Sequence, residues 1–136
     1  MGKGSAGSSR KRQVQGYRSE IKGLRFEQKV ASYFSKKGWN ITIRKPLYGG
    51  EIDIYGEQED LFSGKSYLLV ECKDKEHVSA KDVMHFMKKV TDFHNHQPID
   101  LLGQKPSVKA VLAYTGEIDK DAKKVAFRPK IEFKKF

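Results

Sequence analysis

Apolar and polar residues alternate along the chain in patterns that predict short elements separated by polar turns. Between residues 19 and 37, apolar residues recur at roughly helical spacing with charged residues between them, which predicts an amphipathic helix. Ser19 suits the N-cap of this helix, and Gly38 suits the position that follows its last turn. Residues 39–44 alternate as a strand, and Lys45-Pro46 predicts the end of that strand.

The middle of the chain predicts two further strands. Gly49-Gly50 allows a turn or a bulge, and residues 51–55 follow as a strand with isoleucines on one face and acids on the other. Residues 56–65 are polar and acidic, which predicts a loop. Residues 67–73 form the most apolar segment, and we expect this strand near the centre of its sheet.

The last part of the chain predicts two helices and two strands. A helix from Ser79 to about Phe93 begins with a capping pattern, because Asp82 follows Ser79 by three residues. A strand over residues 108–114, a short helix over 118–127 and a strand over 131–133 complete the order α-β-β-β-α-β-α-β. This order predicts an α/β fold in which helices flank a central mixed sheet.

Chain length, cysteine content and the lack of certain sequence patterns exclude several classes of protein. The 136 residues suffice for one domain with its own core, and a single cysteine allows neither an internal disulfide nor a Cys-rich zinc site. No run of eighteen apolar residues is present, so we expect no membrane-spanning helix and no secretory signal. No Gly-rich phosphate loop is present either, so no nucleoside triphosphate is expected as a partner.

Positive charge is concentrated at the N-terminus. The net charge is +10, and residues 1–18 carry five basic residues and no acid, so half of the excess lies there. We interpret residues 1–17 as a flexible basic arm and residues 18–136 as the folded domain. Arg10, Lys11 and Arg12 would attract nucleic acid by counterion release, although a merely solubilising tail has the same composition.

Two carboxylates stand on successive predicted strands. Seventeen residues separate Asp53 from Glu71, and a hairpin would place both side chains on one sheet face. Because two close carboxylates repel each other, a hard divalent cation such as Mg²⁺ is the simplest compensation. Lys73 projects to the face of Glu71, where its ammonium can orient water or neutralise charge. Cys72 points the other way, and its backbone carbonyl is a candidate further ligand. The alternative to a metal site is that Asp53, Glu71 and Lys73 form a structural cluster of ion pairs.

These residues carry a resemblance to a known superfamily. Gly50-Glu51-Ile52-Asp53 and Val70-Glu71-Cys72-Lys73, behind a helix bearing Phe26-Glu27, resemble the PD-(D/E)xK nucleases, above all Mrr-type restriction endonuclease domains and archaeal Holliday junction resolvases. The resemblance covers roughly residues 20–115 and implies a restriction-endonuclease-like αβββαβ core. It implies that Asp53 and Glu71 bind metal, that Lys73 assists the attacking water, and that Glu27 is an accessory acid.

Two positions depart from the superfamily pattern. Ile52 stands where the superfamily name has proline, and relatives with Gly-Glu-Ile-Asp occur. Glu51 is an extra acid that a regular strand would place on the face of Asp53, where it would compete as a ligand.

The resemblance implies an activity and its partners. We expect a Mg²⁺-dependent endodeoxyribonuclease, with Mn²⁺ as a substitute, acting as a homodimer on duplex or branched DNA in a prokaryotic or archaeal cytoplasm, or in a virus of such a host. Arg44, Lys45 and Lys75 are expected to line the DNA path. Two alternatives stay open: a catalytically silent nucleic-acid-binding module of the same fold, and a metal-binding structural protein. Charge alone does not distinguish RNA from DNA.

Overall fold

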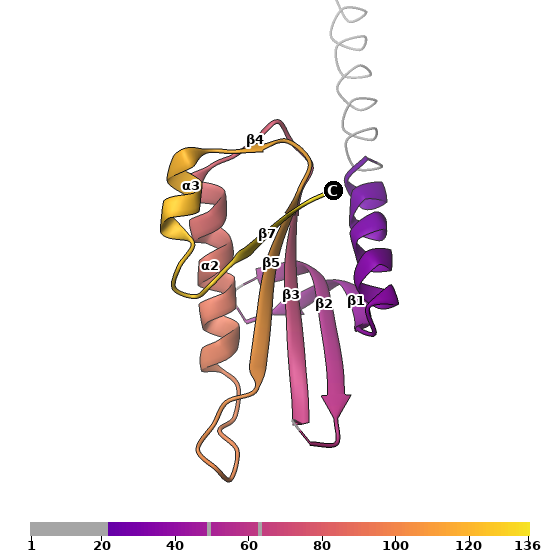
Figure 1. Ribbon diagram of the computed structural model, residues 1–136, viewed down its shortest axis with the longest axis vertical. Helices are drawn as coiled ribbons and strands as arrows, with labels where there is room; N and C mark the ends of the chain where they lie inside the picture. The colour runs from indigo at the N-terminus through magenta and orange to yellow at the C-terminus, as the bar shows by residue number, and fades with distance from the viewer. Residues whose placement is uncertain (1–21, 49, 63) are drawn as a thin grey trace, which may run out of the picture.

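A five-stranded mixed sheet forms the centre of the computed structural model, which describes residues 22–48, 50–62 and 64–136 (Figure 1). The strands lie in the order β1-β2-β3-β5-β7. Strand β2 pairs antiparallel with both β1 and β3, β5 pairs parallel with β3, and β7 pairs parallel with β5. After a first helix over residues 22–36 come β1 (Asn40–Leu47), β2 (Gly50–Asp60), β3 (Gly64–Lys73), β4 (His77–Val78), α2 (Ala80–Asn95), β5 (Ser107–Tyr114), β6 (Glu117–Ile118), α3 (Lys120–Val125) and β7 (Glu132–Lys135).

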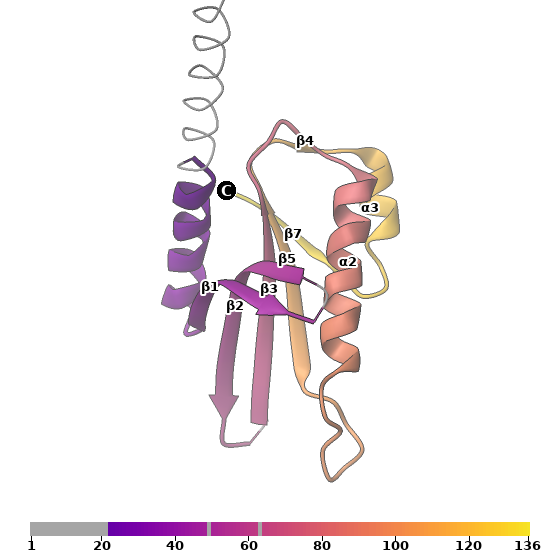
Figure 2. The ribbon, with the colours of Figure 1, turned by 180° about the vertical axis from the view of Figure 1, so that it is seen from behind.

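Helices cover both faces of this sheet, as the sequence predicts. The first helix lies on one face, where Val30 and Phe34 pack against Val70. The helices α2 and α3 lie on the other face, where Phe86 and Val90 pack in a second cluster (Figure 2). Burial of these apolar side chains on both faces stabilises the three-layer arrangement. Among the described residues, no helix is long and apolar enough to cross a membrane.

Several predicted elements are confirmed. The strand over 67–73 lies within β3, third of the five strands, and its residues 68–70 are fully buried. Helix α2 begins after Ser79, whose side chain accepts a hydrogen bond from the Asp82 amide while the Asp82 carboxylate accepts one from the Ser79 amide. The predicted Ser19 cap and residues 1–17 lie outside the described residues.

Two predicted boundaries are wrong. Strand β1 continues through Lys45-Pro46 to Leu47, because β1 is an edge strand of the sheet and an edge position tolerates proline. Most of the predicted loop is strand: residues 56–60 end β2 and residues 64–65 begin β3, with Glu57 paired with Tyr67 and Asp60 with Gly64 in an extended hairpin. Backbone hydrogen bonding across the hairpin outweighs the weak strand preference of its polar side chains.

The prediction that the isoleucines of β2 share one face is also wrong. Ile52 packs in the cluster beneath α2, whereas Ile54 packs beneath the first helix, so the strand changes face between them. The β1–β2 register is interrupted here: Ile43 pairs with Ile54 and Lys45 with Ile52, while Arg44 between them has a φ of 56°, a left-handed value that is uncommon for a residue with a side chain. The closed end of the β1–β2 hairpin therefore bends toward α2 (Figure 2).

Strands β4 and β6 form a small separate parallel pair that the sequence does not predict, since each has only two residues. Gly116 precedes β6 and packs directly against the segment that follows β3. A Cβ atom at Gly116 would collide with the backbone carbonyl oxygens of Lys75 and Glu76.

We therefore expect Gly116→Ala to lower the free energy of unfolding by about 1–3 kcal/mol, because backbone atoms must move to relieve the collision. Gly23→Ala is the matched control. A Cβ atom at this helical position meets nothing within 4 Å, so the substitution should stabilise the protein by about 0.5–1 kcal/mol. Urea unfolding of the two variants measures both effects, and equal stabilities would contradict the close approach at Gly116.

Candidate active site

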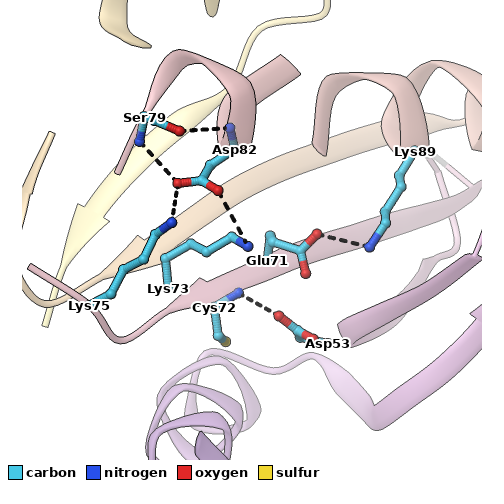
Figure 3. A network of polar contacts seen from close by, with 8 residues as sticks. All are labelled: Asp53, Glu71, Cys72, Lys73, Lys75, Ser79, Asp82 and Lys89. Atoms are coloured by element: carbon cyan, nitrogen blue, oxygen red, sulfur yellow. Dashed lines mark hydrogen bonds and ion pairs between the residues drawn. The ribbon is translucent and has the colours of Figure 1, made fainter. Parts of the chain in front are cut away.

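Asp53 and Glu71 meet where the β1–β2 hairpin bends across the end of β3. The backbone N–H of Cys72 donates a hydrogen bond to Asp53 Oδ2 at 2.8 Å, which fixes the Asp53 carboxylate beside the strand that carries Glu71 (Figure 3). Glu71 is buried, with 5% of its surface exposed. The predicted proximity of these two acids is thus found in the structure, and an irregular strand rather than a regular one produces it.

Lys89 of α2 supplies the positive charge that faces Glu71. Its Nζ atom lies 3.1 Å from Glu71 Oε2 and donates a second hydrogen bond to the backbone carbonyl of Glu51 at 2.8 Å. The side chain of Glu51 itself is exposed. Lys89 therefore connects α2 both to the buried acid, as Figure 3 shows, and to the bent end of the hairpin.

The environment of Glu71 disfavours its negative charge. Burial is the largest cause, followed by a hydrogen bond with Asp53 and repulsion from its carboxylate, and together they raise the pKa of Glu71 to about 8. Lys89 acts in the opposite direction without cancelling them. The two acids therefore share a proton near neutral pH instead of both being ionised, and a bound cation would favour the loss of that proton.

Lys73 and Lys75 both face Asp82 in the first turn of α2. Lys75 Nζ lies 2.5 Å from Asp82 Oδ2, and Lys73 Nζ lies 3.9 Å from Asp82 Oδ1. Burial raises the pKa of Asp82, but the hydrogen bond from Lys75 and those within the helix cap lower it more, and the net shift is downward. Asp82 therefore stays ionised and holds Lys75 tightly and Lys73 loosely (Figure 3).

Glu27 of the first helix pairs with Arg44 rather than with the two acids. Arg44 Nε donates a hydrogen bond to the buried Glu27 carboxylate at 2.9 Å, and this contact is the main cause that raises the pKa of Arg44. Weaker attraction from Glu51 and Asp53 adds to that rise. The structure thus brings Glu27 near the site through Arg44, but residues 22–48, 50–62 and 64–136 contain no cluster of three or more metal-ligating side chains.

The donor set fits a hard divalent cation. Asp53 and Glu71 provide two carboxylates, and Mg²⁺ is commonly held by one or two carboxylates with water completing its shell. Burial raises the pKa of the Cys72 thiol well above its usual range, so the sulfur is a poor ligand and the backbone carbonyl is the relevant donor there. Two carboxylates leave the remaining positions around such an ion to water and substrate oxygens.

The remaining predicted nucleic-acid-binding residues divide into two groups. Arg10, Lys11 and Arg12 lie outside the described residues. Lys45 lies over the ring of Tyr55, with Nζ 4.3 Å from the ring centroid, and Lys75 and Arg44 are ion-paired as described above.

Sequence reasoning missed the roles of Asp82 and Lys89 in this site. The sequence predicts only a helix cap for Asp82 and no role for Lys89. The available signal is their separation of seven residues, which places both on one stripe of α2 beside the buried Phe86. An acid and a base beside the apolar face of a helix indicate that the helix forms ion pairs with charged side chains of the sheet.

The raised pKa of Glu71 makes stability depend on pH. In the unfolded chain Glu71 loses its proton near pH 4.5, whereas the folded protein keeps it up to about pH 8. The folded state binds the extra proton between these values, so stability should fall as pH rises from about 4.5 to about 8 and then level off. Glu71→Gln removes this dependence, and its advantage over the parent should grow by about 1–4 kcal/mol across the window.

Urea unfolding in EDTA at about pH 5, 7 and 9 measures this advantage. Glu132→Gln, at an exposed acid of β7, is the control and should show none of it. A Glu71→Gln advantage that stays constant with pH would show that Glu71 is ionised normally.

The contact between Lys89 and Glu71 predicts a second measurable effect. Lys89→Met keeps the stem of the side chain but removes the ammonium, so in EDTA near pH 8 it should lower the free energy of unfolding by about 1–3 kcal/mol. The exposed neighbour Lys88 is the control, and Lys88→Met should change stability by less than about 0.5 kcal/mol. Excess Mg²⁺ should narrow the Lys89→Met deficit, because the ion replaces the lost positive charge; an unchanged deficit would place the ion elsewhere.

Comparisons with known proteins agree with this geometry. The structure resembles a protein of unknown function, AF1548, with a TM-score of 0.60 and 18% identity over 79% of this chain and 54% of that one. It also resembles a repair endonuclease from Pyrococcus abyssi, with a TM-score of 0.58 and 21% identity over 88% of this chain and 46% of that one. The chain thus spans about half the length of each, and identities this low show a shared fold, which confirms the predicted restriction-endonuclease-like architecture.

No curated protein matches the sequence. A family model does: the one described as restriction endonuclease, named Mrr_cat, matches residues 18–135. That match includes the bent hairpin, the strand with Glu71 and Lys73, and helix α2. The chain therefore belongs to the Mrr-type restriction endonuclease family.

Proposed function

We propose that this protein is a divalent-metal-dependent endodeoxyribonuclease that hydrolyses phosphodiester bonds with an activated water. The observation that carries the proposal is the close approach of half-buried Asp53 to buried Glu71, where the two carboxyl groups repel each other and a cation would relieve that repulsion. Membership of a restriction endonuclease family supplies the reaction class.

Asp53 and Glu71 would hold Mg²⁺, or Mn²⁺ in its place, together with the backbone carbonyl of Cys72. When bound, such an ion lowers the pKa of water and stabilises charge on the phosphate. The hydrogen bond from the Cys72 amide keeps one Asp53 oxygen fixed and leaves the other for the ion. Burial of Glu71 limits the water around it and strengthens every charge interaction there.

Lys73 is suited to hold the attacking water or to neutralise developing charge. Its Nζ atom is 3.9 Å from Asp82, a loose contact that leaves ammonium protons available to another acceptor. Lys75 is closer to Asp82 and is therefore less available. Glu27 would act through Arg44, since its carboxylate orients the guanidinium beside Asp53.

The DNA path would run over Arg44 and Lys45 at the bend of the hairpin and past Lys75, with the N-terminal arm adding contacts to the backbone. Similarity in fold to a protein described as a repair endonuclease supports branched or damaged DNA as well as linear duplex. One site can cut one strand, so cleavage of a duplex on both strands favours a homodimer.

A catalytically silent nucleic-acid-binding module is the second candidate. One observation favours it: Lys75 and Lys89 already pair with acids of the same chain, as in a site whose charges are satisfied internally. The two candidates differ in what happens when metal and DNA are supplied together.

A cleavage assay with labelled linear duplex, flap and four-way junction, in Mg²⁺, Mn²⁺ or EDTA, tests the proposal. Asp53→Asn, Glu71→Gln and Lys73→Met should each lower the cleavage rate by about 100-fold or more, because each removes a charge beside the reacting phosphate. Asp121→Asn and Lys124→Met, at exposed positions of α3, are the matched controls and should cleave normally.

DNA binding in EDTA should survive in Lys73→Met within a few-fold. Binding without cleavage of any substrate in either metal would overturn the proposal and favour the silent module. Cleavage that persists in all three site variants would move the active site away from β3.

A further inference from the structure

A groove of about 710 Å³ lies on the face of the sheet that carries the first helix, and it shares no residue with the candidate active site. The last turn of that helix and the following Trp39 form one side, and β5 and β7 form the other. Gln58 of β2 also lines the groove, so it lies between the end of the helix and strands from both halves of the sheet.

Positive charge and aromatic rings converge in this groove. Lys37, Lys109 and Lys134 line it, against the single acid Glu132, which pairs with Lys109 at 3.6 Å. Two of these ammonium groups approach one ring: Lys134 Nζ is 4.5 Å and Lys37 Nζ 5.4 Å from the centroid of Tyr33.

Tyr33 and Trp39 are both half-buried, so packing holds their rings while part of each stays accessible. Tyr33 is held edge-on by Phe34 and Phe136, with ring centroids 5.0 and 5.5 Å away. Such fixed rings lose little conformational freedom when a planar group stacks on them.

We propose that this groove binds a segment of single-stranded nucleic acid, with bases stacked on Tyr33 or Trp39 and phosphates held by Lys37 and Lys134. Base stacking on an aromatic side chain is stronger than an exposed contact between a lysine and a ring, so a base can displace the ammonium groups toward its own phosphates. Duplex DNA fits less well, because its bases are already stacked and paired. The binding site goes beyond the proposed nuclease activity and does not depend on it.

Trp39 is the single tryptophan of the chain, and its fluorescence therefore reports on this groove alone. The experiment titrates the full-length protein with oligothymidylate in EDTA, so that cleavage plays no part. It follows Trp39 fluorescence together with the anisotropy of a label on the oligonucleotide. We expect quenching of Trp39 that saturates with the anisotropy change.

The variant Lys37→Gln/Lys134→Gln should weaken the quenching titration by about 10-fold, since two phosphate contacts are lost. Tyr33→Leu, which keeps an apolar side chain in place, should weaken it by about 5-fold or more. The matched control is Lys123→Gln/Lys124→Gln, which removes the same charge from exposed positions of α3 and should leave the quenching unchanged.

Three results would overturn the proposal. An anisotropy change without Trp39 quenching would place the strand elsewhere on the protein. Equal quenching by polyglutamate would identify the groove as a surface for acidic peptides, and equal quenching by duplex DNA would identify a backbone surface without base stacking. Because no metal is present, a failed cleavage assay affects none of these outcomes.

Discussion

The buried contact between Glu71 and Lys89 constrains most of the structure around it. A carboxylate on a central strand is costly to remove from water, and an ammonium 3.1 Å away offsets part of that cost only if α2 lies in one position. The same ammonium binds the Glu51 carbonyl, so the helix also fixes the bent end of the β1–β2 hairpin. Lys89 thus ties α2 to the bend, in addition to the apolar packing of Phe86 and Val90 and to the Cys72 amide that holds Asp53.

The bend explains why the sequence predicts the site better than it predicts the strands that form it. Alternation in residues 51–55 places both isoleucines on one face, yet Ile52 and Ile54 serve opposite cores. Alternation of apolar and polar residues predicts a strand with one buried face. In this strand the buried face changes at Asp53, so that residues before and after it pack in different cores. The left-handed conformation of Arg44, at the interruption of the β1–β2 register, accompanies that crossing, and no residue preference in the sequence predicts it.

Elements with strong local signals were predictable, and contacts between elements were not. The helix after Ser79, the buried strand over 67–73 and the mixed sheet follow from periodicity, capping and the order of segments. The ion pairs of Asp82 and Lys89 depend on where a helix docks, which is a tertiary property. Likewise, β4 and β6 are too short to show any period and exist only through their mutual pairing.

The Asp82 carboxylate has two roles. The same carboxylate that accepts the Ser79 amide and starts α2 also receives Lys73 and Lys75. Asp82→Ala would release the lysines and remove this cap together, whereas Asp82→Asn keeps an oxygen that can accept the Ser79 amide and removes only the charge that attracts the lysines. Sequence drift at this position can therefore retune the two lysines while keeping the start of α2 only through side chains that still accept a hydrogen bond.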